Sequence, residues 1–193
     1  MDRKWHVVSS QSLLHDRWIN VRADHCVTPS GADINPYYVL TYPDWVHVVA
    51  ITRSNEIVLV RQYRHAAADF FLELPAGTTD SSDSNTETCA RRELEEETGY
   101  VATDWQLVSV LHPNPGTQTN RVHIFLARDA ERKGTQALDA GEEGLTVEVI
   151  PVAEVLAGLA SGLLGQSTHV SSLLLGLAAA GRLQLRDSDP GRP

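Results

Sequence analysis

The chain has 193 residues, which suits one domain with a sizeable core and room for a small extra subdomain. Its 16 basic and 25 acidic residues give a formal net charge of −9. Because nucleic acids and anionic membranes attract basic surfaces, this charge argues against both as partners.

The two cysteines, Cys26 and Cys89, lie far apart and lack the spacing of a metal site. We therefore expect free thiols, a buried Cys89 and a reducing, cytoplasmic environment. The first residues, MDRKWHVVSS, contain no apolar run typical of a signal peptide. The chain also lacks the GxxxxGK(S/T) and GxSxG segments, which excludes a P-loop nucleotidase and a serine esterase.

The first part of the chain has the pattern of a small antiparallel sheet. Residues 5–14 and 17–28 carry alternating or β-branched runs that are typical of strands. A Pro-Ser-Gly turn signal follows at 29–31, and a further strand is expected to begin at Tyr37.

A strand pair is predicted next, at 45–52 and 56–64, with Ser54 and Asn55 in the hairpin turn. The run IVLV at 57–60 is apolar at every position. This pattern favours a central strand that is buried on both faces.

One helix is predicted between Ser84 and Gly99. Ser84, Asn85 and Thr86 are all good N-cap residues, and the pair Ser84 and Glu87 fits a capping box. Gly99 stands where a helix stop is expected.

Three acidic residues of this helix, Glu93, Glu96 and Glu97, project from one face. Carboxylates this close repel one another, which is tolerable when a divalent cation such as Mg²⁺ or Mn²⁺ binds among them. The alternative is a solvated acidic face. The metal interpretation gains support from the preceding strand, 70–74, and the tight Pro-Ala-Gly loop at 75–77, which together would provide a backbone floor.

After the helix, strands are predicted at 105–111 and 122–127, on either side of a rigid loop at 112–116. Residues 129–144 are polar and rich in turn formers, so we expect a mobile loop. A strand at 145–150 follows it.

The segment 155–181 has no charged residue and is long enough to cross a bilayer. Polar residues at 166–169 interrupt it, and three glycines weaken a continuous helix. We therefore predict two short helices, 152–160 and 168–180, no membrane span, and a frayed tail from Arg186.

The helix and the loop before it resemble a known signature. The run RELEEETGY at 92–100, preceded by Gly77, resembles the Nudix box, GX5EX7REUXEEXGU, in which U is aliphatic or aromatic. The spacing from Gly77 to Arg92 is one residue longer than in the family. The first Glu of the box has no counterpart, because Asp83 or Ser84 occupies its place, and we interpret this as a remodelled loop.

The resemblance implies the α/β (α+β) Nudix fold, an α/β/α sandwich, at 43–185, with a flexible tail at 186–193. The N-terminal β subdomain, 1–42, resembles the region through which ADP-ribose-hydrolysing Nudix enzymes form dimers, so a homodimer is expected. The implied cofactors are two or more Mg²⁺ (or Mn²⁺) ions per site.

Site residues follow from the same resemblance. It implies Glu93 and Glu97 as main metal ligands, Glu96 as a shared ligand, and the Ala76 carbonyl as a further one. Arg92 would hold the Glu96 carboxylate by an ion pair. Catalytic roles are expected for these box residues and for a general base from the polar loop. The candidates for the base are Glu142 and Glu143, with solvated loop carboxylates as the alternative.

The segment VRQYRHA, followed by LELPAG, resembles the ADP-ribose group of the family. Arg64 would then bind the diphosphate, since a guanidinium can grip phosphate oxygens with two hydrogen bonds. The alternative is a surface ion pair with Asp69 or Glu73.

Trp18 and Tyr37 or Tyr38 resemble the aromatic residues that such enzymes place against the adenine, although half-buried sheet aromatics would fit as well. Pro115 and Gly116 resemble part of the substrate loop of ADP-ribose pyrophosphatases. Asn120, however, stands where many of them have an acid, which is closer to bacterial Nudix proteins with less defined substrates.

The predicted activity is metal-dependent hydrolysis of a nucleoside diphosphate linked to another moiety, with ADP-ribose giving AMP and ribose 5-phosphate as the favoured reaction. Alternatives are a dinucleoside polyphosphate, another NDP-sugar or a coenzyme as substrate. A non-catalytic sensor that binds a nucleotide sugar is a further alternative.

Overall fold

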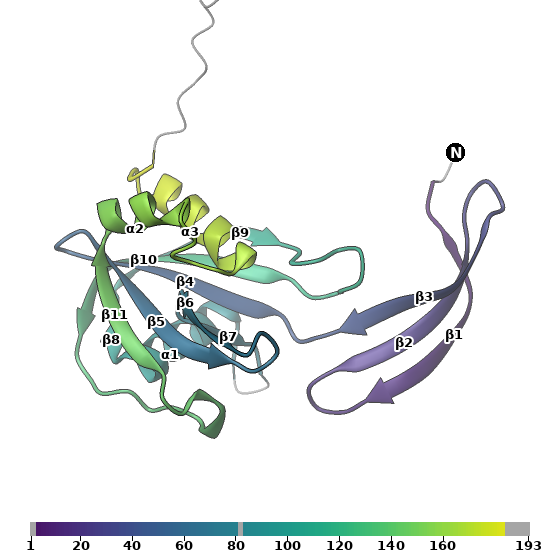
Figure 1. Ribbon diagram of the computed structural model, residues 1–193, viewed down its shortest axis with the longest axis horizontal. Helices are drawn as coiled ribbons and strands as arrows, with labels where there is room; N and C mark the ends of the chain where they lie inside the picture. Colours follow the sequence, from purple (N-terminus) through teal and green to yellow (C-terminus); the bar gives the residue numbers. More distant parts are fainter. Residues whose placement is uncertain (1–2, 81–82, 184–193) are drawn as a thin grey trace, which may run out of the picture. The chain divides into compact units, whose positions relative to one another are not determined.

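The computed structural model describes residues 3–80 and 83–183, and the chain divides into two compact units (Figure 1). The first unit combines residues 1–44 with 111–122, and the second combines 45–110 with 123–193. The predicted tail, 186–193, lies outside the described residues.

The first unit contains the expected small antiparallel sheet. Its order is β1 (His6–His15), β2 (Asn20–Val27) and β3 (Asp33–Thr41). Segment 111–122 attaches to β3, because the Leu40 amide donates to the Thr117 carbonyl at 2.7 Å and Leu40 in turn accepts from the Thr119 amide. Sequence patterns did not reveal this attachment.

The second unit is built on a larger sheet with the path β11-β5-β4-β10-β8. Strand β6 pairs with β5, β7 with β4, and β9 with β10. The strands are β4 (Trp45–Thr52), β5 (Glu56–Arg64), β6 (Asp69–Glu73), β7 (Ala76–Thr78), β8 (Tyr100–Val101), β9 (Asp104–Leu111), β10 (Val122–Arg132) and β11 (Thr146–Pro151).

Two parts of this sheet differ from the prediction. The expected loop at 75–77 runs into strand β7, which pairs with β4 through Val46 and His47. Strand β10 extends to Arg132, so the first residues of the predicted polar loop are strand. Short or polar strands such as these carry little periodicity, and their neighbours in the sheet determine them.

The core of the second unit lies on both faces of β4 and β5. Residues 57–60 are 0% exposed, as the apolar run predicted. Val48 and Ala50 belong to a buried cluster with Leu94 of helix α1 (Thr86–Thr98). Val49 points to the opposite face, where a Cβ on Gly176 of helix α3 (Ser167–Ala179) would lie 2.6 Å from its side chain. Helices therefore cover both faces of the sheet, which confirms the predicted sandwich.

Helix α1 begins after Asn85, whose side chain accepts a hydrogen bond from the Thr88 amide at 2.9 Å. The predicted capping box of Ser84 and Glu87 is therefore wrong, because Asn85, another of the three candidate N-cap residues, supplies the cap. Gly99 ends the helix with a φ of 71°, as expected for a left-handed C-cap.

The apolar C-terminal segment forms two helices, α2 (Val152–Leu159) and α3 (Ser167–Ala179), in agreement with the prediction. Within residues 3–80 and 83–183, no helix is long and apolar enough to span a bilayer.

Residues 133–139 and the short 3₁₀ helix η1 (Ala140–Glu142) follow β10. The Ala137 amide donates to the Glu96 carbonyl at 2.8 Å, and the Gln136 side chain donates to the Glu97 carbonyl at 2.8 Å. These bonds tie the polar segment to the C-terminal end of α1.

Candidate metal and substrate site

Two carboxylates of α1 lie one turn apart beneath strand β7. Glu93 and Glu97 are only 7% and 1% exposed. The Ala76 amide donates to Glu97 Oε2 at 3.0 Å. A Cβ on Gly77 would lie 2.0 Å from Glu93 Oε1, so only glycine allows the strand to approach this carboxylate so closely.

A third carboxylate comes from η1. One oxygen from each of Glu93, Glu97 and Glu142 lies within 4.8 Å of the others; we call these three residues the carboxylate cluster. The Asp139 amide donates to Glu142 Oε2 at 2.9 Å and orients its side chain. Glu143 is exposed and lies outside this cluster.

The carboxylate cluster is electrostatically unfavourable as it stands. Burial raises the pKa of Glu93 to about 7, against the opposing effect of Arg92. Burial also raises the pKa of Glu97 well above its ordinary value, and the charges of Glu93 and Glu142 add to this rise. A cation bound among these oxygens would remove the penalty.

Arg92 organises the rim of the cluster. Its Nη1 donates to Glu96 Oε2 at 3.0 Å, as predicted from the spacing, and lies 2.9 Å from Glu93 Oε1. Its Nη2 donates to Asp83 Oδ2 at 3.1 Å. Asp83 lies near the place of the missing box Glu, and the hydrogen bond from Arg92 lowers the pKa of its carboxyl.

Glu96 lies apart from the buried pair. Its side chain is 42% exposed and contacts Arg92, so the structure does not bring it into the carboxylate cluster. Its backbone carbonyl instead anchors the polar segment at Ala137.

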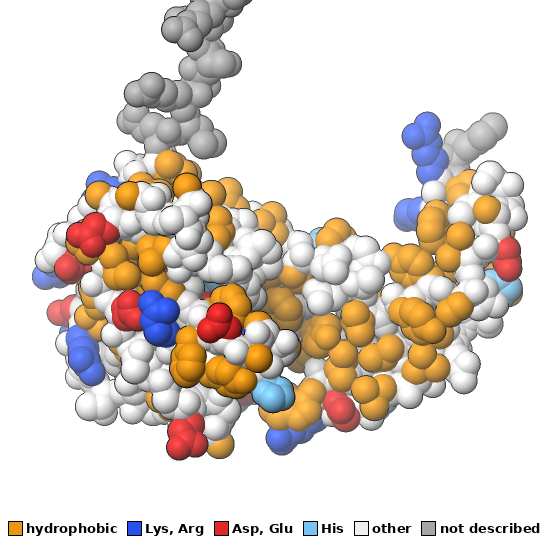
Figure 2. All heavy atoms as spheres, in the orientation of Figure 1, with side chains coloured by type: hydrophobic (Ala, Val, Ile, Leu, Met, Phe, Trp, Pro, Cys, Tyr) orange, Lys and Arg blue, Asp and Glu red, His pale blue; other side chains and the backbone are white. Residues whose placement is uncertain are grey.

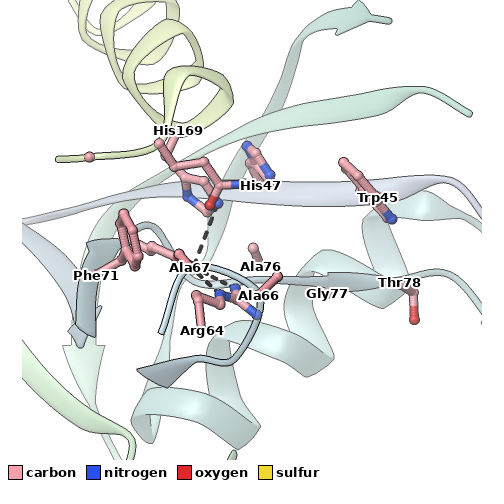
Figure 3. A pocket seen from close by; sticks show the side chains of 13 residues that line it. Trp45, His47, Arg64, Ala66, Ala67, Phe71, Ala76, Gly77, Thr78 and His169 are labelled. Carbon is pink, nitrogen blue, oxygen red and sulfur yellow. Dashed lines mark hydrogen bonds and ion pairs between the residues drawn. The ribbon is translucent and has the colours of Figure 1, made fainter. Parts of the chain in front are cut away.

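A cavity of about 510 Å³ is lined in part by strand β7, the same strand that contacts the carboxylate cluster. Ala76 and Gly77 line it, and Trp45, Arg64 and Phe71 stand around it (Figure 3). Because the two β7 residues also contact the glutamates of α1, the cavity adjoins the carboxylate cluster.

Arg64 lies in the cavity wall and pairs with Glu73. Its Nε donates to Glu73 Oε1 at 3.0 Å and its Nη2 donates to Oε2. Asp69 instead accepts from the Phe70 amide. Of the two predicted ion-pair partners, the structure therefore shows Glu73, which is fully buried rather than on the surface.

Two buried histidines that sequence reasoning did not single out also line the cavity. The rings of His47 and His169 stack with centroids 4.1 Å apart. Burial lowers the pKa of His169 to about 3 and that of His47 well below its ordinary value, so both rings are neutral. They come from β4 and α3, and no local motif links two positions so distant in the chain.

The remaining predicted substrate residues lie in the first unit. The Tyr37 hydroxyl donates to the Gly116 carbonyl, which brings the predicted aromatic and the Pro115–Gly116 turn together. Trp18 is 67% exposed, with the Arg17 guanidinium 4.2 Å from its ring centroid. Asn120 is buried, and its side-chain atoms find no partner among the residues described.

Comparison with known families agrees with this geometry. The family described as "NUDIX domain" matches residues 41–167, and "Nucleoside diphosphate sugar hydrolase N-terminal domain" matches residues 5–40. The chain belongs to the Nudix family, as the box predicted, and it is a Nudix pyrophosphohydrolase.

Several named relatives are similar over much of the chain. An ADP-ribose pyrophosphatase of Mycobacterium tuberculosis is 28% identical over 90% of this chain and 83% of its own. The methanol dehydrogenase activator of Bacillus methanolicus is 30% identical over 70% of this chain and 72% of its own length. A GDP-mannose pyrophosphatase of Cronobacter sakazakii is 30% identical over 61% of this chain and 64% of its own length.

A solved structure titled "Crystal structure of ADP compounds hydrolase" has the same fold. It superposes with a TM-score of 0.80 at 22% sequence identity. The match covers 93% of this chain and 97% of that one.

Proposed function

We propose that this protein uses a divalent metal ion to hydrolyse the diphosphate bond of a nucleoside diphosphate linked to another group. ADP-ribose, giving AMP and ribose 5-phosphate, is the first substrate to test. The observation that carries the proposal is the carboxylate cluster, in which three carboxylates meet and burial disfavours their charge, beside a cavity with an arginine in its wall. The names of the relatives support a nucleoside diphosphate derivative as substrate.

The residues present fit a hard divalent cation. Glu93, Glu97 and Glu142 offer oxygen ligands within 4.8 Å of one another, and we add the Ala76 carbonyl to this set. Glu96 remains our candidate for a shared ligand if two or more Mg²⁺ (or Mn²⁺) ions bind at the site. When bound, such an ion supplies Lewis-acid stabilisation of the charge that develops on the diphosphate oxygens.

The protein's own groups then have distinct roles. Arg64 binds diphosphate oxygens from the cavity wall. Glu142 accepts the proton of the attacking water, because η1 places its carboxylate beside the buried glutamates. Arg92 keeps the rim carboxylates of α1 in place through its ion pairs.

The direct test is product analysis with ADP-ribose and Mg²⁺, with and without a chelator. Glu97→Gln is expected to lower kcat/KM at least 100-fold, or about 3 kcal/mol, because it removes a charge that stabilises the transition state. Glu95→Gln is the matched control, since Glu95 is exposed on the same helix. Unchanged turnover in Glu97→Gln would refute the metal assignment.

A second substrate class deserves the same assay. The GDP-mannose pyrophosphatase relative favours another NDP-sugar, and dinucleoside polyphosphates and coenzymes complete the panel. We also propose Trp18, Tyr37, Pro115 and Gly116 as substrate contacts, and the Tyr37–Gly116 hydrogen bond supports a joint role for the last three. Tight binding without product release across the whole panel would indicate a sensor instead.

We further propose a homodimer formed through the first unit. Strand β1 is exposed at every position and pairs only with β2 within the described part of the chain. Its four apolar residues Val7, Val8, Leu13 and Leu14 are each 50% exposed or more, and Figure 2 shows apolar side chains gathered over this sheet. An unpaired apolar edge invites a second chain.

Sedimentation velocity should then give about twice the chain mass of 21.2 kDa. The double variant Val8→Lys, Leu14→Lys should shift the protein to monomer, whereas a monomeric wild type would refute the dimer.

We also propose a cytoplasmic location. The free, buried thiols of Cys26 and Cys89 support it, because a reducing compartment keeps cysteines unpaired.

A further inference from the structure

The Arg64 guanidinium has two hydrogen-bonding edges, and only one of them is used inside the fold. Its Nε and Nη2 atoms form a fork that binds the two carboxylate oxygens of Glu73. No described residue accepts a hydrogen bond from Nη1. Since the side chain is 44% exposed and lines the cavity, the outer edge formed by Nη1 and Nη2 remains available to an anion there.

Glu73 is itself held from two further sides. It is 0% exposed, and Gln62 Nε2 donates to its Oε2 at 3.2 Å. His169 Nε2 lies 3.7 Å from the same oxygen. His169 Nδ1 accepts from the Leu74 amide at 3.0 Å, so the neutral ring carries its proton on Nε2, facing Glu73.

The strand register shows that Glu73 is not the acidic residue directly opposite Arg64 in the sheet. Arg64 stands directly opposite Asp69 in the β5–β6 ladder, whereas Glu73 stands opposite Val60. The Arg64 side chain therefore extends back along β5 to reach Glu73. A simple cross-strand pair would leave the guanidinium beside Asp69, away from the buried carboxylate.

We propose that Glu73 is a positioning residue, supported by Gln62 and His169, that sets the outer edge of Arg64 toward a phosphate group of the substrate. The inference rests on the proposed function and deepens it, since it names how the binding arginine is aimed. Glu73 also lines the cavity, but it is 0% exposed and both of its oxygens face Arg64, so we assign its effect to the orientation of Arg64.

The first test compares two carboxylates of the same hairpin. Glu73→Gln should raise KM for ADP-ribose about 10–100-fold, the range seen when supporting groups are removed, with a smaller change in kcat and unchanged Mg²⁺ dependence. Asp69→Asn should leave both constants unchanged. Equal KM values in Glu73→Gln and wild type would overturn the proposal.

The second test separates positioning from stability. In Arg64→Ala, added guanidinium ion should restore part of the activity, because Glu73 retains the site that binds it. In Arg64→Ala combined with Glu73→Gln, the same additive should restore none. Equal rescue in the two backgrounds would show that Glu73 does not position the cation.

A shorter carboxylate and a binding measurement without hydrolysis provide two further tests. If Glu73→Gln does not fold, Glu73→Asp decides, because its shorter carboxylate keeps the charge but withdraws from Arg64, and an unchanged KM overturns the proposal. Calorimetric binding of ADP-ribose without metal does not depend on hydrolysis. Provided that wild type binds ADP-ribose, equal affinity in Glu73→Gln would refute the positioning role even if the protein does not hydrolyse ADP-ribose, and if wild type does not bind it, the same comparison is made with GDP-mannose.

Discussion

The β5–β6 hairpin and helix α1 both carry buried carboxylates, yet they differ in what neutralises the charge. Glu73 of the hairpin is fully buried and forms a two-point ion pair with Arg64. Glu97 of the helix is almost as buried, and its hydrogen-bond partner is the Ala76 amide rather than a cation. Because an uncompensated buried charge is costly, the carboxylate cluster is suited to an external cation, whereas the hairpin is already complete.

The same contrast holds for the two arginines. Arg92 bonds Asp83 and Glu96 and reaches Glu93 at the edge of the carboxylate cluster. Arg64 keeps one edge available to the cavity. One arginine therefore supports the metal side of the site, and the other supports the substrate side.

The largest effect should separate the two loop glutamates. Glu142→Gln removes the proposed proton acceptor and a cluster oxygen, so kcat should fall about 10²–10⁴-fold. Glu143→Gln is the matched control, because Glu143 is exposed and outside the cluster. Steady-state kinetics with Mg²⁺ measures both, and similar losses in the two variants would contradict the assignment.

Gly77→Ala should break the cluster without touching a carboxylate. The new Cβ would displace the flexible Glu93 carboxylate, so we expect activity to fall roughly 10–100-fold while the fold persists. Gly134→Ala is the control, since a Cβ there meets nothing within 4 Å. Full activity of Gly77→Ala would show that the Glu93 position is not critical.

The pH dependence of stability should reveal what it costs to bury the Glu93 charge. Burial raises the pKa of Glu93 to about 7 in the folded protein, above its ordinary value of 4.5. The unfolded chain therefore loses this proton first, and the metal-free protein should lose stability as pH rises from about 4.5 to 7. We expect Tm to fall by roughly 5–10 °C, since a few kcal/mol shifts Tm by that amount in a chain of this size.

Thermal melting of metal-free protein across this pH range checks the sign. Added Mg²⁺ should restore Tm, and Glu93→Gln should flatten the slope. A metal-free Tm that rises from pH 5 to 7 would contradict the role assigned to burial.

Asp83→Asn should give the smallest change. It weakens one support of Arg92 but leaves the pair with Glu96, so activity should fall by up to about tenfold. Kinetics beside Asp80→Asn, a change in the same loop, measures it. A loss as large as that of Glu142→Gln would mean that Asp83 has a more direct role.

Local patterns predicted much of this arrangement. The bounds of β4 and β5 agree with the strand pair predicted at 45–52 and 56–64, and the i, i+4 spacing anticipated the Arg92–Glu96 pair. These features depend on neighbouring residues alone.

Features that depend on distant segments were not predicted. Strand β7 exists because β4 offers it a partner, and Glu142 was not separable from Glu143 until η1 was placed beside α1. The stacked pair His47 and His169 joins elements more than a hundred residues apart. The residue pattern of a single segment does not predict contacts with a distant segment.

The most direct test of the account is a titration of metal-free protein with Mn²⁺, followed by electron paramagnetic resonance. Wild type and Glu73→Gln should bind the ion with similar affinity, whereas Glu97→Gln should bind it at least about tenfold more weakly. Equal Mn²⁺ affinity in wild type and Glu97→Gln would contradict the claim that the buried carboxylates of α1 hold the metal.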